Sequence, residues 1–91
     1  MSEVTYRQNP KTAGRVIDGQ AFVVTPHDNK LHTLNGSGAA IWDLAERGCT
    51  LEEVVALLTR RFEVDAERAL GDAGRFLEDL TARRILEKVG P

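Results

Sequence analysis

The chain changes its hydrophobic pattern at one place, the segment Leu34–Trp42 with the sequence LNGSGAAIW. Before it, apolar residues come in short runs interrupted by turn residues; after it, they recur every three or four residues. The first pattern is typical of strands and the second of amphipathic helices. Gly36 and Gly38 allow a tight turn. The side chain of Asn35 or Ser37 can cap a helix by accepting a hydrogen bond from a backbone N–H group that has no partner within the helix. We therefore expect a small sheet to end here and a helical bundle to begin.

Size and charge restrict the classes of protein to consider. The chain has 91 residues, enough for one hydrophobic core, and a net charge of −2, which disfavours non-specific binding to nucleic acid. Its single cysteine, Cys49, cannot form an internal disulfide, which favours a reducing compartment. The first twenty residues lack the apolar stretch of a signal peptide, and no apolar run is long enough to cross a membrane. We expect a cytoplasmic protein without membrane partners.

The part before the junction predicts a three-stranded antiparallel meander. Residues 1–13 are polar and without period, and are expected to form a flexible N-terminal arm on a single domain of residues 14–91. Strands are expected after Gly14 (residues 15–17), at residues 20–25 and at residues 30–34. Asp18-Gly19 favours a type I′ hairpin turn, because both central residues need positive φ. The first and third strands would form the edges.

The part after the junction predicts three helices. The first is expected over residues 37–47 and ends at Gly48. The second follows a capping box, in which Thr50 and Glu53 bond each other's backbone N–H, and the third follows an Asp65 cap. Ile85-Leu86 is expected as a short extended segment over the core. The fold class is therefore α+β, with the second and third helices resembling a helix-turn-helix and the strands a wing.

No group of residues predicts catalysis, a metal site or a cofactor. A helix N-terminus can activate a thiol, but Cys49 is better explained as a small residue in a tight connection. His27 and His32 have no cysteine or acidic residues at ligand spacing. We expect a protein that is not an enzyme.

Two surfaces can bind a partner. The third helix could be read as a DNA recognition helix, but its four acidic and four basic residues cancel. The exposed edge of the third strand has unpaired backbone groups that can accept an extended peptide, with the third helix alongside to supply pockets. Gly71 and Gly74 cost helix stability and could open a furrow for that peptide; simple tolerance by tertiary packing explains them equally well.

Several short motifs resemble the PqqD-like peptide chaperones, also called RiPP recognition elements. Leu34-Asn35, Gly38-Ala39 and Ile41-Trp42 resemble the family signature. The likeness extends over roughly residues 14 to 86, through the motifs Asp18-Gly19, Gly48-Cys49-Thr50, Glu53-Val54, Phe62-Glu63-Val64-Asp65 and Phe76-Leu77 to Leu80.

The resemblance implies a winged helix-turn-helix-like domain that does not bind DNA. It would hold the leader segment of a ribosomally made precursor peptide and present it to a modifying enzyme, often a radical S-adenosylmethionine protein, in natural-product or pyrroloquinoline quinone biosynthesis. The leader would add as a strand, which implies a site made of Lys30, Leu31, His32, Thr33 and Leu34, with Leu70, Gly74 and Leu77 on the third helix.

Two residues depart from the family pattern. His32 stands where the family often has an aromatic residue, so its pocket is expected to be more polar or the residue to be a partly buried core histidine. Arg84 stands where a glycine often precedes the last apolar pair. Alternation along the strand places His32 and Leu34 toward the helices, and Leu31 and Thr33 away.

A winged-helix DNA regulator and a homodimer joined by its edge strands remain the alternatives.

Replacing Gly71 and Gly74 together by alanine tests the furrow. Each change should raise the free energy of unfolding, by up to about 1 kcal/mol, because glycine is a poor helix former. If the furrow binds peptide, the double variant should also bind more weakly in a titration. Higher stability with unchanged affinity would reject the furrow.

Overall fold

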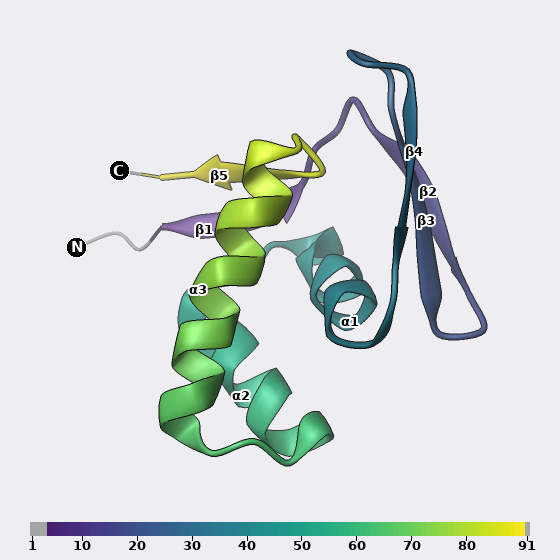
Figure 1. Cartoon of the computed structure of the whole chain (residues 1–91). Coiled ribbons are helices and arrows are strands. Elements are labelled where there is room, and N and C mark those ends of the chain that lie inside the picture. The colour runs from purple at the N-terminus through teal and green to yellow at the C-terminus, as the bar shows by residue number, and fades with distance from the viewer. Residues whose placement is uncertain (1–3, 91) are drawn as a thin grey trace.

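The computed structural model describes residues 4–90 and contains two small sheets and three helices (Figure 1). The elements in chain order are β1 Thr5–Gln8, β2 Ala13–Ile17, β3 Gln20–Thr25, β4 Lys30–Leu34, α1 Gly36–Leu44, a 3-10 turn Ala45–Arg47, α2 Leu51–Phe62, α3 Ala66–Ala82 and β5 Leu86–Val89. The expected α+β class, with three helices after a three-stranded sheet, is confirmed.

The three-stranded sheet has the antiparallel order β2-β3-β4 that the sequence predicts. Asp18 and Gly19 form the first turn with φ values of 51° and 78°, as a type I′ turn requires. Ile17 pairs with Gln20 across this turn, and Ala21 pairs with Leu34 at the other end of the meander. β2 and β4 are the edges of this sheet.

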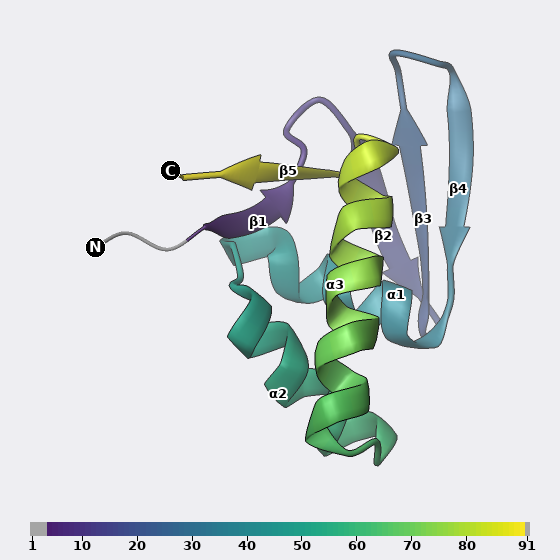
Figure 2. The same cartoon turned by 60° about the vertical axis from the view of Figure 1, so that its left-hand side comes forward.

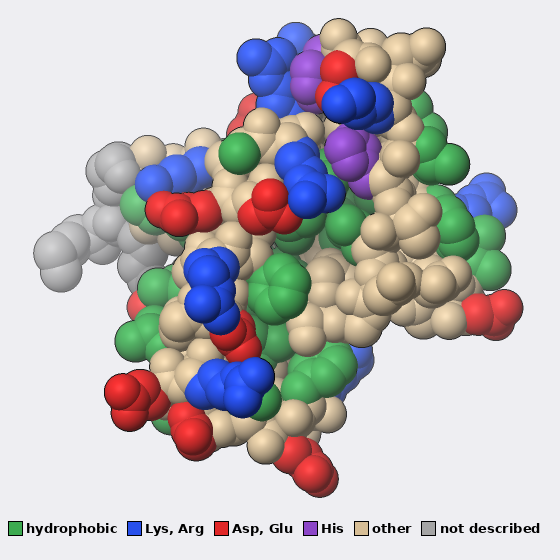
Figure 3. Space-filling model, in the orientation of Figure 1, with side chains coloured by type: hydrophobic (Ala, Val, Ile, Leu, Met, Phe, Trp, Pro, Cys, Tyr) green, Lys and Arg blue, Asp and Glu red, His purple; other side chains and the backbone are tan. Residues whose placement is uncertain are grey.

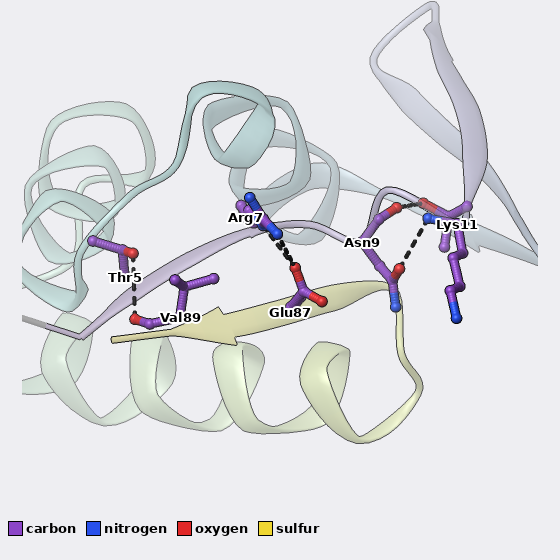
Figure 4. Close-up of polar contacts among 7 residues, drawn as sticks. Thr5, Arg7, Asn9, Lys11, Glu87 and Val89 are labelled. Atoms are coloured by element: carbon purple, nitrogen blue, oxygen red, sulfur yellow. Dashed lines mark hydrogen bonds and ion pairs between the residues drawn. The ribbon is translucent and has the colours of Figure 1, made fainter. Parts of the chain in front are cut away.

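The N-terminal segment differs from the expected flexible arm, because residues 5–8 form β1. β1 pairs antiparallel with β5, and Thr5 lies opposite Val89. Figure 4 shows the side chains of Arg7 and Glu87, whose Nη2 and Oε2 atoms are 2.6 Å apart, along this ladder. On the other side of β1, Tyr6 exchanges two backbone hydrogen bonds with Cys49, of 2.7 and 2.8 Å. Contacts on both sides therefore hold a strand that is too short to be recognised from its sequence.

The helix boundaries follow the predicted caps with one exception. Thr50 and Glu53 form both hydrogen bonds of the capping box, at 3.2 and 2.9 Å, and Asp65 Oδ1 accepts from Arg68 N at 2.8 Å. Asn35 is at the cap position of α1, but its side chain makes no cap hydrogen bond. Its Oδ1 accepts from Gln20 Nε2 at 2.7 Å instead, which joins the start of α1 to the sheet.

One continuous core lies between the sheet and the helices, and the junction segment is part of it. Leu34, Ala39, Ile41 and Trp42 are all buried. A Cβ atom on Gly14 would lie 2.9 Å from the Trp42 ring and 2.7 Å from the Phe22 carbonyl oxygen, so only glycine fits there without movement. Figure 2 shows α1 beside the base of the sheet, with α3 extending along the height of the molecule.

Residues Leu86–Val89 form β5, so the extended segment expected at Ile85-Leu86 begins at Leu86; both of these residues are buried. Arg84, just before it, has a φ of 60°, a left-handed conformation that favours glycine. Its departure from the family pattern therefore falls on a backbone position where a side chain costs stability. Among residues 4–90, no helix is long and apolar enough to span a bilayer.

Arg84→Gly should raise the free energy of unfolding by about 1 kcal/mol, because glycine adopts the left-handed conformation without the Cβ contact. Urea denaturation gives this value. Arg83→Gly is the matched control: Arg83 has a right-handed φ of −81°, so glycine there should be neutral or destabilising. Equal effects of the two changes would contradict the explanation.

Candidate functional site

The outer edge of β4 is the open margin of the sheet on the side of α3. Within residues 4–90, β4 pairs only with β3, and β1 pairs with β5 rather than with β4. In both views α3 extends roughly along the direction of β4, with α1 near the base between them (Figures 1 and 2). The N-terminal residues described by the structure therefore leave this edge uncovered.

The sheet register identifies the backbone groups that β4 offers. In a two-residue hairpin the closing pair, here Ile17 and Gln20, is of the hydrogen-bonded kind, and bonded and non-bonded pairs then alternate. β3 consequently directs Ala21, Val23 and Thr25 toward β4, where their partners are Leu34, His32 and Lys30. The N–H and C=O groups of Leu31 and Thr33 point outward. These two residues can pair with an added strand.

The side chains of β4 alternate as the sequence predicts. Leu34 is buried and His32 half-buried on the side of the helices, whereas Leu31 is 64% exposed on the opposite face. Thr33 and Lys30 are exposed. The five residues of the predicted strand site thus form one continuous edge.

An open hollow of about 450 Å³ lies along α3 and reaches the start of α1. In Figure 3 it separates a helix that carries alternating basic and acidic side chains from the polar edge of the sheet, with apolar side chains at its floor. Its lining consists of Ser37, Val64, Arg68, Asp72, Arg75, Phe76 and Asp79.

The helix residues predicted for the site do not line this hollow. Leu77 is only 1% exposed and belongs to the core. Leu70 precedes it by seven residues, or two helical turns, and therefore lies on nearly the same side of α3, but it is 53% exposed. Nothing lies within 4 Å of the position of a Cβ atom on Gly74. Contact of Leu70, Gly74 and Leu77 with a peptide remains a prediction. The charged stripe with Phe76, spaced three and four residues apart, is the signal that sequence reasoning overlooked.

His32 belongs to a small polar cluster at the start of β4. The buried hydroxyl of Thr25 donates to Asp28 Oδ1 at 2.5 Å and lies 3.0 Å from His32 Nε2. Because the hydroxyl proton is used on Asp28, Nε2 must carry a proton and donate to Thr25. His32 is thus a partly buried, hydrogen-bonded residue with its other ring nitrogen free of this cluster.

Two titratable groups have shifted pKa values. The hydrogen bond from Thr25 holds the pKa of Asp28 below its ordinary value of 3.8, and the charges of His27, Lys30 and His32 act in the same direction. Burial raises the pKa of the Cys49 thiol to about 11, and the Glu53 carboxylate adds to the rise. The fully buried Cys49 is therefore a packed thiol rather than an activated nucleophile.

This chain is similar to known proteins in sequence and in fold. The family model of coenzyme PQQ synthesis protein D (PqqD) matches residues 20–86. The chain belongs to the PqqD family. The structure of TbiB1 in complex with the TbiA(beta) leader peptide is similar to this PqqD family member, with a TM-score of 0.83 and 24% sequence identity over 93% of this chain and 99% of that chain. At this identity the likeness shows a shared fold. No curated protein sequence matches the chain.

Thr25→Val in this PqqD family member should raise the pKa of Asp28 toward 3.8, because it removes the hydrogen bond to the carboxylate. A depressed carboxyl pKa stabilises the fold above the unfolded pKa, and this stabilisation is lost as the pH falls through the folded value. The loss of stability below about pH 4 should therefore be smaller in the variant. Carbon-detected NMR titration of Asp28 measures the shift. Thr33→Val, on the exposed face, should leave the pKa unchanged.

Proposed function

We propose that this chain is a non-catalytic peptide chaperone that binds the leader segment of a ribosomally made precursor peptide. The observation that carries the proposal is the open edge of β4, where Leu31 and Thr33 direct backbone donors and acceptors away from the sheet beside the hollow of α3. Membership of the PqqD family supports it. The match to TbiB1, which was solved with a leader peptide bound, supports the same kind of ligand.

The leader would add to β4 as a further strand and place alternate side chains over the hollow. Each new backbone hydrogen bond contributes about 0.5–1.5 kcal/mol net, whereas micromolar binding needs about 8 kcal/mol. Strand pairing alone is therefore insufficient. The apolar surface of Phe76 and Val64 in the hollow supplies a place for a side-chain anchor.

Binding of this kind would serve a second protein that performs the chemistry. The chain would hold the precursor in an extended form and deliver it to a modifying enzyme, such as a radical S-adenosylmethionine protein, in the biosynthesis of a natural product or of pyrroloquinoline quinone. The chain itself would need no cofactor for this role. Its contribution would be local concentration and orientation of the substrate.

The charge of α3 favours a peptide over duplex DNA as the ligand. Asp72 and Asp79 lie on the same side of the helix as the arginines, and each carboxylate pairs with a neighbouring guanidinium. A phosphate array approaching this face would meet carboxylates as well as arginines. A gel shift at low salt should accordingly show no retardation of duplex DNA.

Leu31→Pro should weaken leader binding at least about tenfold, because proline removes an outward N–H and its ring obstructs the added strand. The leader of a precursor encoded beside this gene is the probe, and isothermal titration calorimetry measures its affinity. The substitution is compatible with the sheet, since the lost N–H is not used to pair with β3.

Val16→Pro is the matched control. Val16 occupies the equivalent outward position on β2, the other edge of the sheet, and should leave the affinity unchanged. Leu31→Val keeps the N–H and should bind nearly as well as the natural chain. Equal loss in Leu31→Pro and Val16→Pro would reject strand addition to β4, and light scattering in the same samples detects pairing of two copies.

A further inference from the structure

In the hollow beside α3, a single carboxylate, that of Asp72, serves as the partner of two guanidiniums. Asp72 is shared by two arginines: Arg68 Nε lies 3.7 Å from Oδ2, and Arg75 bonds Oδ1. The neighbouring Asp79 accepts from Arg83 Nε at 3.2 Å. The hollow is therefore lined by two arginines and two aspartates, but Asp79 is paired with Arg83, which lies outside the lining, so that Asp72 alone is paired with Arg68 and Arg75. This shortage of carboxylate partners is confined to Asp72, since the whole chain has a net charge of −2.

The arginines are free to move onto a ligand, whereas their carboxylate partner is partly covered. The side chains of Arg68 and Arg75 are 73% and 77% exposed, but that of Asp72 is 22% exposed. Exposed ion pairs of this type contribute little free energy. An arginine can therefore leave Asp72 and pair with a carboxylate of a bound peptide at a small cost in free energy. The single carboxylate of Asp72 cannot form the bidentate hydrogen bonds of a guanidinium–carboxylate pair with both arginines at once.

An apolar floor lies beside these charges in the same hollow. Val64 and Phe76 are half-buried, pack against the core and line the hollow together with the two arginines. In an extended peptide, alternate residues face the same side and lie about 6.7 Å apart. Arg68 and Arg75 are two helical turns apart, about 10 Å along the axis, with Phe76 next to Arg75. An apolar and an acidic side chain two residues apart would suit this surface.

We propose that the peptide bound in this hollow carries an Asp or Glu two residues from a large apolar residue. The apolar side chain packs on Phe76 and Val64, and the carboxylate takes the guanidinium of Arg68 or Arg75 that Asp72 leaves incompletely paired. This inference rests on the proposed function and adds to it a chemical class of ligand, an acidic leader segment.

Selection from a random library tests the inference without knowledge of the natural precursor. Random 15-residue peptides are selected by mRNA display on the immobilised full chain and sequenced. The natural chain should enrich Asp or Glu two residues from a large apolar residue. The variant Arg68→Glu/Arg75→Glu should enrich Lys or Arg at that place. The matched control Arg60→Glu/Arg61→Glu changes the same charge on α2 and should keep the acidic motif.

Milder variants keep the test valid if charge reversal impairs folding. Arg75→Gln should weaken the binding of an enriched peptide about threefold, as expected for an exposed pair. Asp72→Asn should tighten it by a similar factor, because it removes the competing carboxylate; a merely structural role for Asp72 would not produce tighter binding.

The outcomes separate the two proposals. If the natural chain enriches no peptide, the proposed function fails. If it enriches peptides without acidic residues, or if the motif is the same in the Arg68→Glu/Arg75→Glu variant, the charge inference alone is overturned and strand addition stands.

Discussion

The packing of Trp42 against Gly14 determines how the two halves of this molecule meet. The indole is nearly buried and lies so close to β2 that a Cβ atom at position 14 has no room. The Trp42 carbonyl oxygen also accepts from Gln8 Nε2 at 2.8 Å, so the same residue joins the helices to the end of β1. Since protein interiors are densely packed, this contact leaves little freedom in the distance between sheet and helices.

Much of the fold could be predicted because its signals are local. The Asp18-Gly19 turn, the capping box at Thr50 and the cap at Asp65 each involve residues a few positions apart, and each forms as expected. β1 could not be predicted in this way. Its partners, β5 and Cys49, are distant in sequence, and its four residues show no distinctive pattern. Asn35 illustrates a third case, in which a tertiary hydrogen bond to Gln20 replaces the expected local cap.

The candidate site was predictable on its strand side and less so on its helix side. Alternation in β4 follows from strand geometry alone, and the burial of Leu34 and exposure of Leu31 agree with it. A helix, in contrast, has a buried face and two flanks, and hydrophobic periodicity identifies only the buried face. Leu77, which the family resemblance implies for the site, is buried in the core, and its contact with a peptide stays a prediction. The flank that lines the hollow is mostly charged, with Phe76 at its border.

The pairing of β1 with β5 has a consequence for how this domain can be joined to other proteins. Thr5 and Val89 are opposite each other in one ladder, so the two ends of the domain emerge together (Figure 1). They do so on the far side of α3 from β4. A covalent tether at either end, or insertion of the whole unit into a surface loop of an enzyme, would leave the open edge of β4 unobstructed. In the proposed function, the peptide would then reach the enzyme within one molecule rather than pass between two.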